Sequence, residues 1–497
     1  MTVRSKAKRG MFWVGGARIA VKAMSFVEFL ILAKLLIPEH FGLVATADLA
    51  INALLLFQEL GFGAALIYRQ DDIEDAADTA FWTVLGTSAA LYVVAFLAAP
   101  FVASIFSKTP ASAAEVTSIL RVLAVTLVIS ALGKVHYTLL AKELDFRRKV
   151  IPEFLGQLGG AITSLTLAFL GFGAWSIVYG RVLESSAMTI LVWAFFRWRP
   201  RLRFHRNLAG EMFTYAKHIL GSQVMVFFIT NIDDAFVARL AGPAALGLYG
   251  LAYKLSNMPA TEVSRVVAQV MFPTFSTIRE DMAAFKRAFL TSTRYVSLVA
   301  IPISLCIVFF ASDFVLGIYG QKWAGAVLPL QLLVVYGLAR SIAVNMGNAI
   351  KAGGKPQWIT AIATWRLTTM AVFLYPATSR YGIVGVGGLS AIVAIVDFGI
   401  SVWMVGHIVH TTWGDWVRLL TAPFLAALTA AALAKFAFLH DINALRVTIA
   451  LPVAGALMVA LYVAILWLID RRFRQLVSEM TRYGLGLLGR ARPATGS

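Results

Sequence analysis

Five basic residues lie deep within long apolar stretches of this 497-residue chain: Arg18, Lys22, Lys254, Arg340 and Arg366. Lys22, for example, comes roughly 16 Å after the start of the first stretch, at a rise of about 1.5 Å per helical residue. An ionised side chain is costly in hydrocarbon, so such groups are usually kept for a cavity, a partner or a transport pathway. Arginine binds phosphate through paired hydrogen bonds and lysine as a point charge. Together the five side chains could hold a phosphate or diphosphate in one aqueous cavity.

Four acidic residues occupy similarly deep positions: Asp48, Asp233, Asp234 and Asp397. A carboxylate at such a depth could bind Na⁺ or carry a proton in a gradient-driven cycle. Equally, the four acids could neutralise the deep basic residues, and both interpretations stay open. Arg181 and Glu184 are three residues apart, which predicts a local ion pair on one helix.

Redox, metal and ATP-driven chemistry find little support in the sequence. Cys306 is the only cysteine, which excludes an intramolecular disulfide and a four-cysteine zinc site. The phosphate-binding signature Gly-Lys-Ser/Thr does not occur, so the chain encodes no ATPase of that kind. His407 and His410 have no obvious third ligand. We expect neither a metal site nor a cofactor.

Enzymatic activity is also not expected. Membrane enzymes that polymerise or transfer sugars generally carry their catalytic groups in a sizeable outer loop, and every outer loop predicted here is short. The acidic run Asp71–Asp75 looks superficially like a pair of catalytic carboxylates. It follows Arg69 in a short polar segment, so we expect a solvated turn.

The elements that must position these side chains are long apolar helices. Hydrophobic residues make up 59% of the chain and charged residues only 14%, whereas soluble proteins have about 25% charged residues. The apolar segments, each long enough to cross about 30 Å of hydrocarbon, are 11–36, 41–68, 79–106, 114–140, 151–170, 175–196, 211–240, 244–272, 295–318, 327–350, 357–378, 383–406, 419–439 and 447–470. Strands of a membrane barrel would alternate apolar and polar residues, which these segments do not. We therefore predict an all-α polytopic membrane protein with about fourteen transmembrane helices.

The orientation of these helices follows from the basic residues in the loops. Alternate loops, starting with residues 1–10, contain 27 Lys and Arg residues, and the opposite set contains four. The positive-inside rule then places both termini in the cytoplasm. The same asymmetry explains the net charge of +18 without a nucleic-acid partner.

An internal repeat relates two parts of the chain. Residues 33–54 align with residues 238–259 at an offset of 205, with Pro38 over Pro243 and Gly42 over Gly247. Six predicted helices separate the two copies, and an even number preserves their orientation. Parallel repeats of this kind place a substrate site between two halves of a transporter.

The repeat and the loops together predict a domain organisation. It comprises an N-terminal lobe of six helices (1–196), a basic cytoplasmic linker (197–210), a C-terminal lobe of six helices (211–418), two further helices (419–470) and a basic cytoplasmic tail (471–497). The two lobes should be pseudo-symmetric. The linker could bind anionic lipid head groups, or it could simply anchor the chain on the cytoplasmic side.

Several segments resemble the Wzx-type polysaccharide flippases of the multidrug/oligosaccharidyl-lipid/polysaccharide exporter superfamily. They are Leu35–Val44, Glu59–Arg69, Asp233–Tyr249 and Val270–Ile278. The resemblance covers the first twelve predicted helices. It implies two six-helix lobes that alternate access in a bacterial inner membrane.

The resemblance also implies a function and its partners. Such a flippase moves undecaprenyl-diphosphate-linked oligosaccharide units from the cytoplasmic to the periplasmic leaflet for exopolysaccharide, capsule or O-antigen synthesis. Its partners would be the lipid-linked oligosaccharide, membrane lipids, and polymerase and export proteins, and its cycle would use H⁺ or Na⁺. A cation-coupled multidrug exporter and a lipid II flippase are alternatives with the same fold, and a membrane polymerase or ligase is a more distant one.

Overall fold

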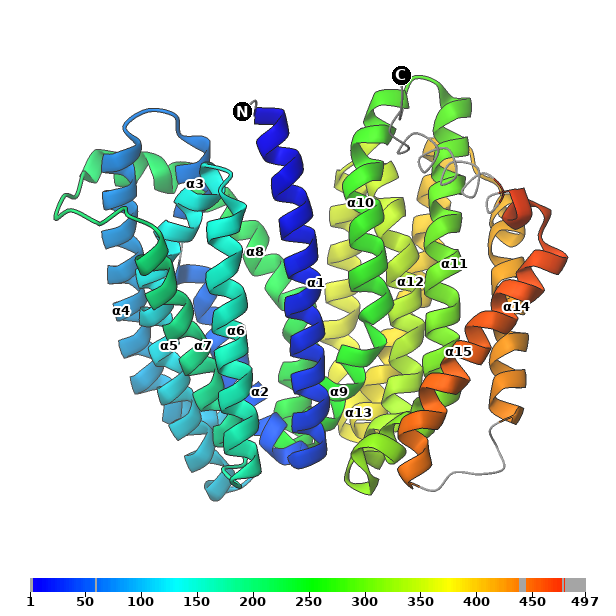
Figure 1. Cartoon of the computed structure of the whole chain (residues 1–497), viewed down its shortest axis with the longest axis horizontal. Helices are drawn as coiled ribbons and strands as arrows, with labels where there is room; N and C mark the ends of the chain where they lie inside the picture. Colours follow the sequence, from blue (N-terminus) through cyan, green and yellow to red (C-terminus); the bar gives the residue numbers. More distant parts are fainter. Residues whose placement is uncertain (1–2, 59, 438–443, 476–477, 479–497) are drawn as a thin grey trace, which may run out of the picture. The chain divides into compact units, whose positions relative to one another are not determined.

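The computed structural model describes residues 3–58, 60–437, 444–475 and 478. Within these residues the chain forms helices and no strand, which confirms the all-α class (Figure 1). The helices of the first half are α1 (Val3–Leu35), α2 (Pro38–Gln58), α3 (Phe62–Tyr68), α4 (Ile73–Phe106), α5 (Pro110–Lys142), α6 (Phe146–Phe169), α7 (Ala174–Phe195) and α8 (Arg206–Ala241). Those that follow are α9 (Pro243–Ser256), α10 (Met258–Ile278), α11 (Met282–Phe314), the short η1 (Val315–Tyr319) and η2 (Gln321–Ala326), α12 (Val327–Ala352), α13 (Gln357–Val409), α14 (Trp413–Ala437) and α15 (Ala444–Ile469).

Every predicted apolar segment coincides with a helix or a pair of helices. Nine spans among the described residues are long and apolar enough to cross a membrane by themselves. Helices α1, α6, α8 and α10 are not among these nine, and each carries two or more charged residues. The predicted number of about fourteen transmembrane helices therefore remains a prediction.

Three predicted boundaries differ from the observed ones. The segment 41–68 is two helices, α2 and α3, because Leu60 and Gly61 turn the backbone in the left-handed region. The segment 244–272 is divided into α9 and α10 at Asn257. By contrast, segments 357–378 and 383–406 join into α13, which bends at Gly382, where φ is 56°. Glycine adopts this backbone conformation without the steric cost that a side chain would add.

The chain divides into two compact units. The first comprises residues 1–251 and 370–386, and the second comprises residues 252–369 and 387–497. In the first unit α4 packs on α5, α5 on α2 and α7, and α6 on α1 and α7. In the second unit α12 packs on α10 and α11, and α14 packs on α11 and α15. The lobe boundaries expected from the sequence are not tested by this division, since α9 and α13 each extend over it.

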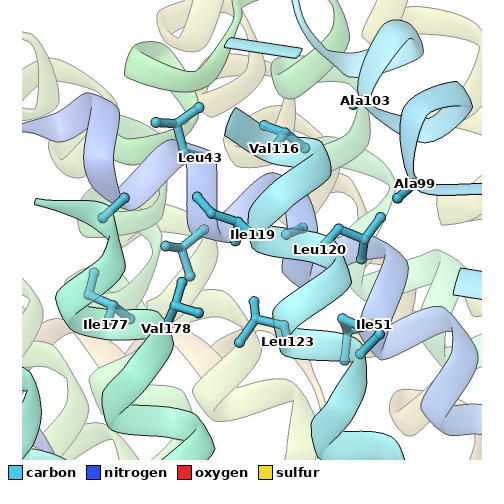
Figure 2. Packing of buried hydrophobic residues seen from close by; sticks show 14 of the residues in the cluster. Leu43, Ile51, Ala99, Ala103, Val116, Ile119, Leu120, Leu123, Ile177 and Val178 are labelled. Atoms are coloured by element: carbon cyan, nitrogen blue, oxygen red, sulfur yellow. The ribbon is translucent and has the colours of Figure 1, made fainter. Parts of the chain in front are cut away.

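The core of the first unit shows why its helices pack closely. Leu120 and Leu123 of α5, Leu43 of α2 and Val178 of α7 are buried in one apolar cluster (Figure 2). On the α4 side the cluster contains small residues such as Ala99, which let the backbones approach each other. Close packing of this kind replaces the hydrophobic effect as the force between helices in lipid.

The two copies of the sequence repeat touch each other within the first unit. A Cβ added to Gly42 would lie 1.6 Å from the carbonyl oxygen of Pro243, and one added to Gly247 would lie 1.9 Å from that of Pro38. Each glycine thus packs against the proline of the other copy. This reciprocal contact joins the starts of α2 and α9 and has the pattern of a local twofold axis, as expected for parallel repeats.

Replacing Gly42 by Ala should destabilise the protein because the new methyl group overlaps the backbone at Pro243. We expect a cost of about 1–3 kcal/mol, typical of overpacking, and a lower melting temperature of the purified protein in detergent. Gly250→Ala is the matched control, since a Cβ there meets nothing within 4 Å. Equal melting temperatures of the two variants would contradict the contact.

Candidate functional site

The intramembrane charges of the first unit meet between α2 and α7. Arg181 of α7 forms an ion pair with Asp48 of α2. The sequence had predicted Glu184 as the partner of Arg181, and the structure instead places Glu184 where it adds to the negative field around the same guanidinium. Asp48 therefore neutralises a deep cation, which is one of the two roles left open for it.

A cavity of about 390 Å³ opens beside this ion pair. Its polar wall consists of Asp48, Asn52, Thr126, Ser130, Lys134, Tyr137, Arg181, Glu184, Ser185 and Thr189, which come from α2, α5 and α7. Hydroxyl and amide groups lie next to both signs of charge, so the cavity suits water or a polar ligand.

Two further carboxylates, Glu28 and Glu184, act on Arg181, and neither was predicted from the sequence as an ion-coupling residue. Glu28 of α1 acts electrostatically on Arg181 and accepts a hydrogen bond from Nε2 of Gln157 at 3.1 Å. Glu28 and Glu184 are acids inside apolar segments, so the rule that singled out Asp48 would also have found them. Lys134 of α5 lies in the cavity wall. Three carboxylates thus lie around or near Arg181 and Lys134.

Asp233 and Asp234 lie on α8, also in the first unit. Asp233 is buried and accepts a hydrogen bond from the hydroxyl of Tyr249 at 2.6 Å. Asp234, its neighbour in the chain, is half-buried. The structure thus links Asp233 to the middle of α9, two residues after Gly247.

The second unit contains a comparable ion pair on the two arms of α13. Arg366 lies before the bend at Gly382 and Asp397 after it, and their side chains form an ion pair. Asp397 is only 3% exposed, and among the described residues its Oδ1 has no hydrogen-bond partner. The pair therefore ties the two arms together and leaves one carboxylate oxygen available.

Arg340 of α12 lies in an aromatic setting. Its Nη1 donates to the hydroxyl of Tyr336 at 3.3 Å, and the guanidinium lies 5.9 Å from the centre of that ring. The ring of Tyr253, on α9, is 6.3 Å from that of Tyr336. Among the described residues no carboxylate forms an ion pair with this guanidinium, so its charge can still act on an anion.

The remaining predicted cations divide between the two units. Lys22 in the first unit and Lys254 in the second are both exposed. Arg18 lies in α1, and its side chain falls outside the described residues. The five cations are divided between two units that are described separately, so a cavity common to all five remains a prediction.

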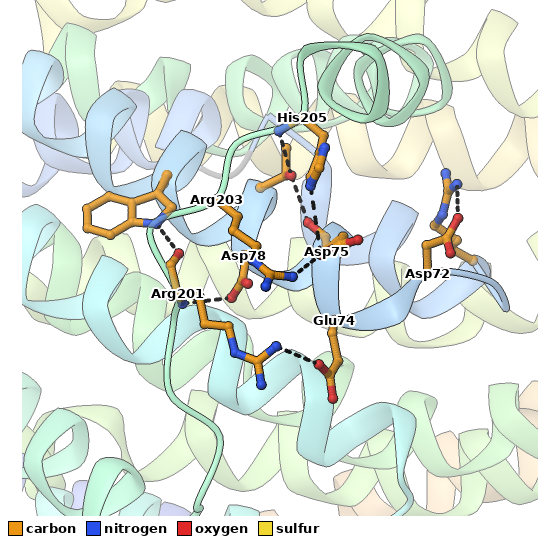
Figure 3. A network of polar contacts seen from close by, with 10 residues as sticks. Asp72, Glu74, Asp75, Asp78, Arg201, Arg203 and His205 are labelled. Atoms are coloured by element: carbon orange, nitrogen blue, oxygen red, sulfur yellow. Dashed lines mark hydrogen bonds and ion pairs between the residues drawn. The ribbon is translucent and has the colours of Figure 1, made fainter.

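The basic linker is held by the acidic run that precedes it in the chain (Figure 3). Arg201 pairs with Glu74 at 3.2 Å and Arg203 with Asp75 at 3.4 Å. The buried Asp78 accepts a hydrogen bond from the backbone N–H of Arg201 at 3.0 Å.

This arrangement corrects two expectations. The acidic residues at the start of α4 are not simply a solvated turn, since they fasten the linker to the first unit. In turn, these two linker arginines already have carboxylate partners, which leaves less charge for anionic lipid than the sequence suggested.

Removing one member of the Arg366–Asp397 pair should destabilise the second unit. Arg366→Gln leaves a buried carboxylate uncompensated, which typically costs about 3–5 kcal/mol, so we expect a low yield of folded protein on size-exclusion chromatography. The double variant Arg366→Gln/Asp397→Asn removes both charges and should recover most of that yield. A single variant that folds as well as the double one would contradict a structural role for the pair.

Comparisons with known proteins agree with this architecture. The lipopolysaccharide biosynthesis protein WzxC of Escherichia coli (strain K12) is 23% identical over 437 residues, which cover 86% of this chain and 87% of WzxC. The succinoglycan biosynthesis transport protein ExoT of Rhizobium meliloti (strain 1021) is 25% identical, covering 97% of each chain. Among solved structures, the lipid II flippase MurJ in an inward closed conformation superposes with a TM-score of 0.74 at 13% identity, over 94% of this chain and all of that one.

These likenesses confirm the resemblance that the sequence segments indicate. The MurJ match shows that the chain has the same fold as that structure. Residues 31–328 match the family model described as polysaccharide biosynthesis protein, which is more than half of the chain. The chain therefore belongs to the polysaccharide biosynthesis protein family.

Proposed function

We propose that this protein is a flippase for undecaprenyl-diphosphate-linked oligosaccharide repeat units. It moves them from the cytoplasmic to the periplasmic leaflet of a bacterial inner membrane, with both of its own termini in the cytoplasm. The observation that carries the proposal is the set of basic side chains within the apolar segments of a chain from this family. A lipid-linked diphosphate is an anion that must cross hydrocarbon, and fixed cations lower the cost of that passage.

Three of these cations are best placed to contact the substrate. Lys22 and Lys254 are exposed, and Arg340 is held by tyrosine rather than by a carboxylate. Arg366 is engaged by Asp397, so its role in binding would follow from an exchange of partners when the diphosphate arrives. Arg18 is the remaining proposed contact, one helical turn before Lys22 on α1.

The energy for the cycle would come from H⁺ or Na⁺. The cluster of Asp48, Glu184 and Glu28 around Arg181 has more negative than positive groups, and it lines or adjoins a polar cavity. A carboxylate in such a setting gains from binding a cation. Asp233, Asp234 and Asp397 remain further candidates for ion coupling.

At the outer leaflet the flipped units would pass to polymerase and export proteins.

Deleting the gene in its native host should cause diphosphate-linked oligosaccharide to accumulate and surface polysaccharide to be lost. Lys22→Gln, Lys254→Gln and Arg340→Gln should each restore polymer at a rate about tenfold or more below wild type, because each removes a charge-assisted contact to phosphate. Lipid extraction and polymer quantification measure both quantities. Arg380→Gln, at an exposed basic residue of a predicted outer loop, is the control and should complement fully.

Unchanged surface polysaccharide in the deletion strain, together with greater sensitivity to cationic dyes, would refute the flippase and favour a drug exporter. If the three variants relieved the accumulation of diphosphate-linked oligosaccharide as well as the wild type does, the proposed role of these cations would be refuted.

Glu184→Gln should uncouple transport from its ion gradient. In proteoliposomes that contain the lipid-linked substrate, an imposed pH or Na⁺ gradient should accelerate flipping by the wild type, and the variant should keep only the slow rate seen without a gradient. Glu39→Gln, at an exposed acid of α2, is the control. A gradient response of normal size in Glu184→Gln would exclude this carboxylate as the coupling group.

A further inference from the structure

A second charged cavity lies in the second unit, away from the intramembrane residues discussed above. Its volume is about 360 Å³, and it is lined by residues at the starts of α11 and α14 and just after the end of α15. Arg294, Arg418 and Arg472 supply its positive charge and Asp415 its negative charge, and Thr291, Tyr295 and Gln475 add hydrogen-bonding groups. The loop count assigns this end of the helices to the cytoplasmic side.

Local hydrogen bonds hold the acidic residues of this region in place. Asp415, in the first turn of α14, accepts a hydrogen bond from the backbone N–H of Thr412 at 3.0 Å, and the hydroxyl of Thr412 accepts one from the N–H of Asp415 at 3.3 Å. This capping arrangement directs Asp415 to Lys286, whose Nζ lies 2.8 Å from Oδ2.

Asp470 has a similar role at the end of α15. Its Oδ1 accepts hydrogen bonds from the backbone N–H groups of Arg472 at 2.9 Å and Phe473 at 3.2 Å. Its Oδ2 forms an ion pair with Arg294. Asp415 is thus paired with Lys286, and Asp470 with Arg294.

The charge balance leaves two guanidinium groups available. Lys286 and Arg294 pair with the two acids, whereas the side chains of Arg418 and Arg472 form no hydrogen bond or ion pair with any residue in the described part of the chain. Both are exposed and line the same cavity. Two open guanidinium groups with hydroxyl and amide donors beside them match the oxygen atoms of one phosphate group.

Apolar side chains line part of the cavity and also lie near its lining residues in the sequence. Leu290 and Leu419 lie in its wall, and Val417, Leu468 and Ile469 close to it in sequence are exposed. Tyr295 has the amphipathic character typical of side chains at a membrane interface. A ligand that fits both parts has a phosphate head and hydrocarbon chains.

We propose that this cavity binds the phosphate head group of an anionic membrane phospholipid of the phosphatidylglycerol class. Basic pockets between transmembrane helices at the cytoplasmic surface suit such head groups. The volume accommodates a glycerol phosphate, whereas a diphosphate that carries several sugars would exceed it. The bound lipid bridges the ends of α11, α14 and α15, so it stabilises the packing of the last two helices. The proposal does not depend on which molecule the protein transports.

The test compares lipid binding by the full-length protein and by matched arginine variants. Native mass spectrometry of detergent-purified protein titrated with phosphatidylglycerol should give an affinity about tenfold or more lower for Arg418→Gln/Arg472→Gln than for wild type. Binding of phosphatidylcholine should be unchanged. Arg471→Gln is the control, since Arg471 is an exposed neighbour of Arg472 that does not line the cavity.

Melting temperatures provide the second readout, and they also report whether the double variant folds. Phosphatidylglycerol should raise the melting temperature of the wild type and of Arg471→Gln but not that of the double variant. Equal stabilisation of all three proteins would overturn the proposal. Stabilisation by inorganic phosphate alone would assign the cavity to a soluble anion, and displacement of phosphatidylglycerol by undecaprenyl diphosphate would assign it to the substrate. Either outcome would refute a resident phospholipid.

Discussion

The high cost of an isolated charge in hydrocarbon governs how this protein is built. Arg181 and Arg366 each lie within an apolar segment, and each is paired with a carboxylate of another helix or helix arm, Asp48 and Asp397. Each partner offsets the cost of the other's charge within an apolar segment, so the helices must bring the partners together. The pairs therefore do more than neutralise charge, because they specify which helices or helix arms meet.

The same constraint gives the deep cations different settings. Arg181 and Arg366 are held by carboxylates, whereas the guanidinium of Arg340 lies against a tyrosine and the side chains of Lys22 and Lys254 are exposed. At the ends of the helices the cost of charge falls and the pairing becomes looser. There the linker arginines meet the start of α4, and Arg418 and Arg472 remain open to a lipid phosphate.

Close backbone contact is the second requirement of a fold without a hydrophobic driving force between its helices. The reciprocal contacts of Gly42 with Pro243 and Gly247 with Pro38 show how a duplicated sequence meets this requirement. Each copy supplies both the glycine and the proline, so one motif serves both sides of the contact.

The sequence by itself determined the helical class, the approximate position of every apolar segment, the repeat and the family resemblance. These properties depend on the local run of apolar residues and on motifs that lie close together in the chain. Which charges meet depended on the tertiary structure. Arg181 selects Asp48, 133 residues away, over the nearby Glu184, and the acidic run holds a linker more than 120 residues later. An ion pair depends on the spatial separation of two side chains in a low-dielectric environment, and sequence spacing gives that separation only within a single helix.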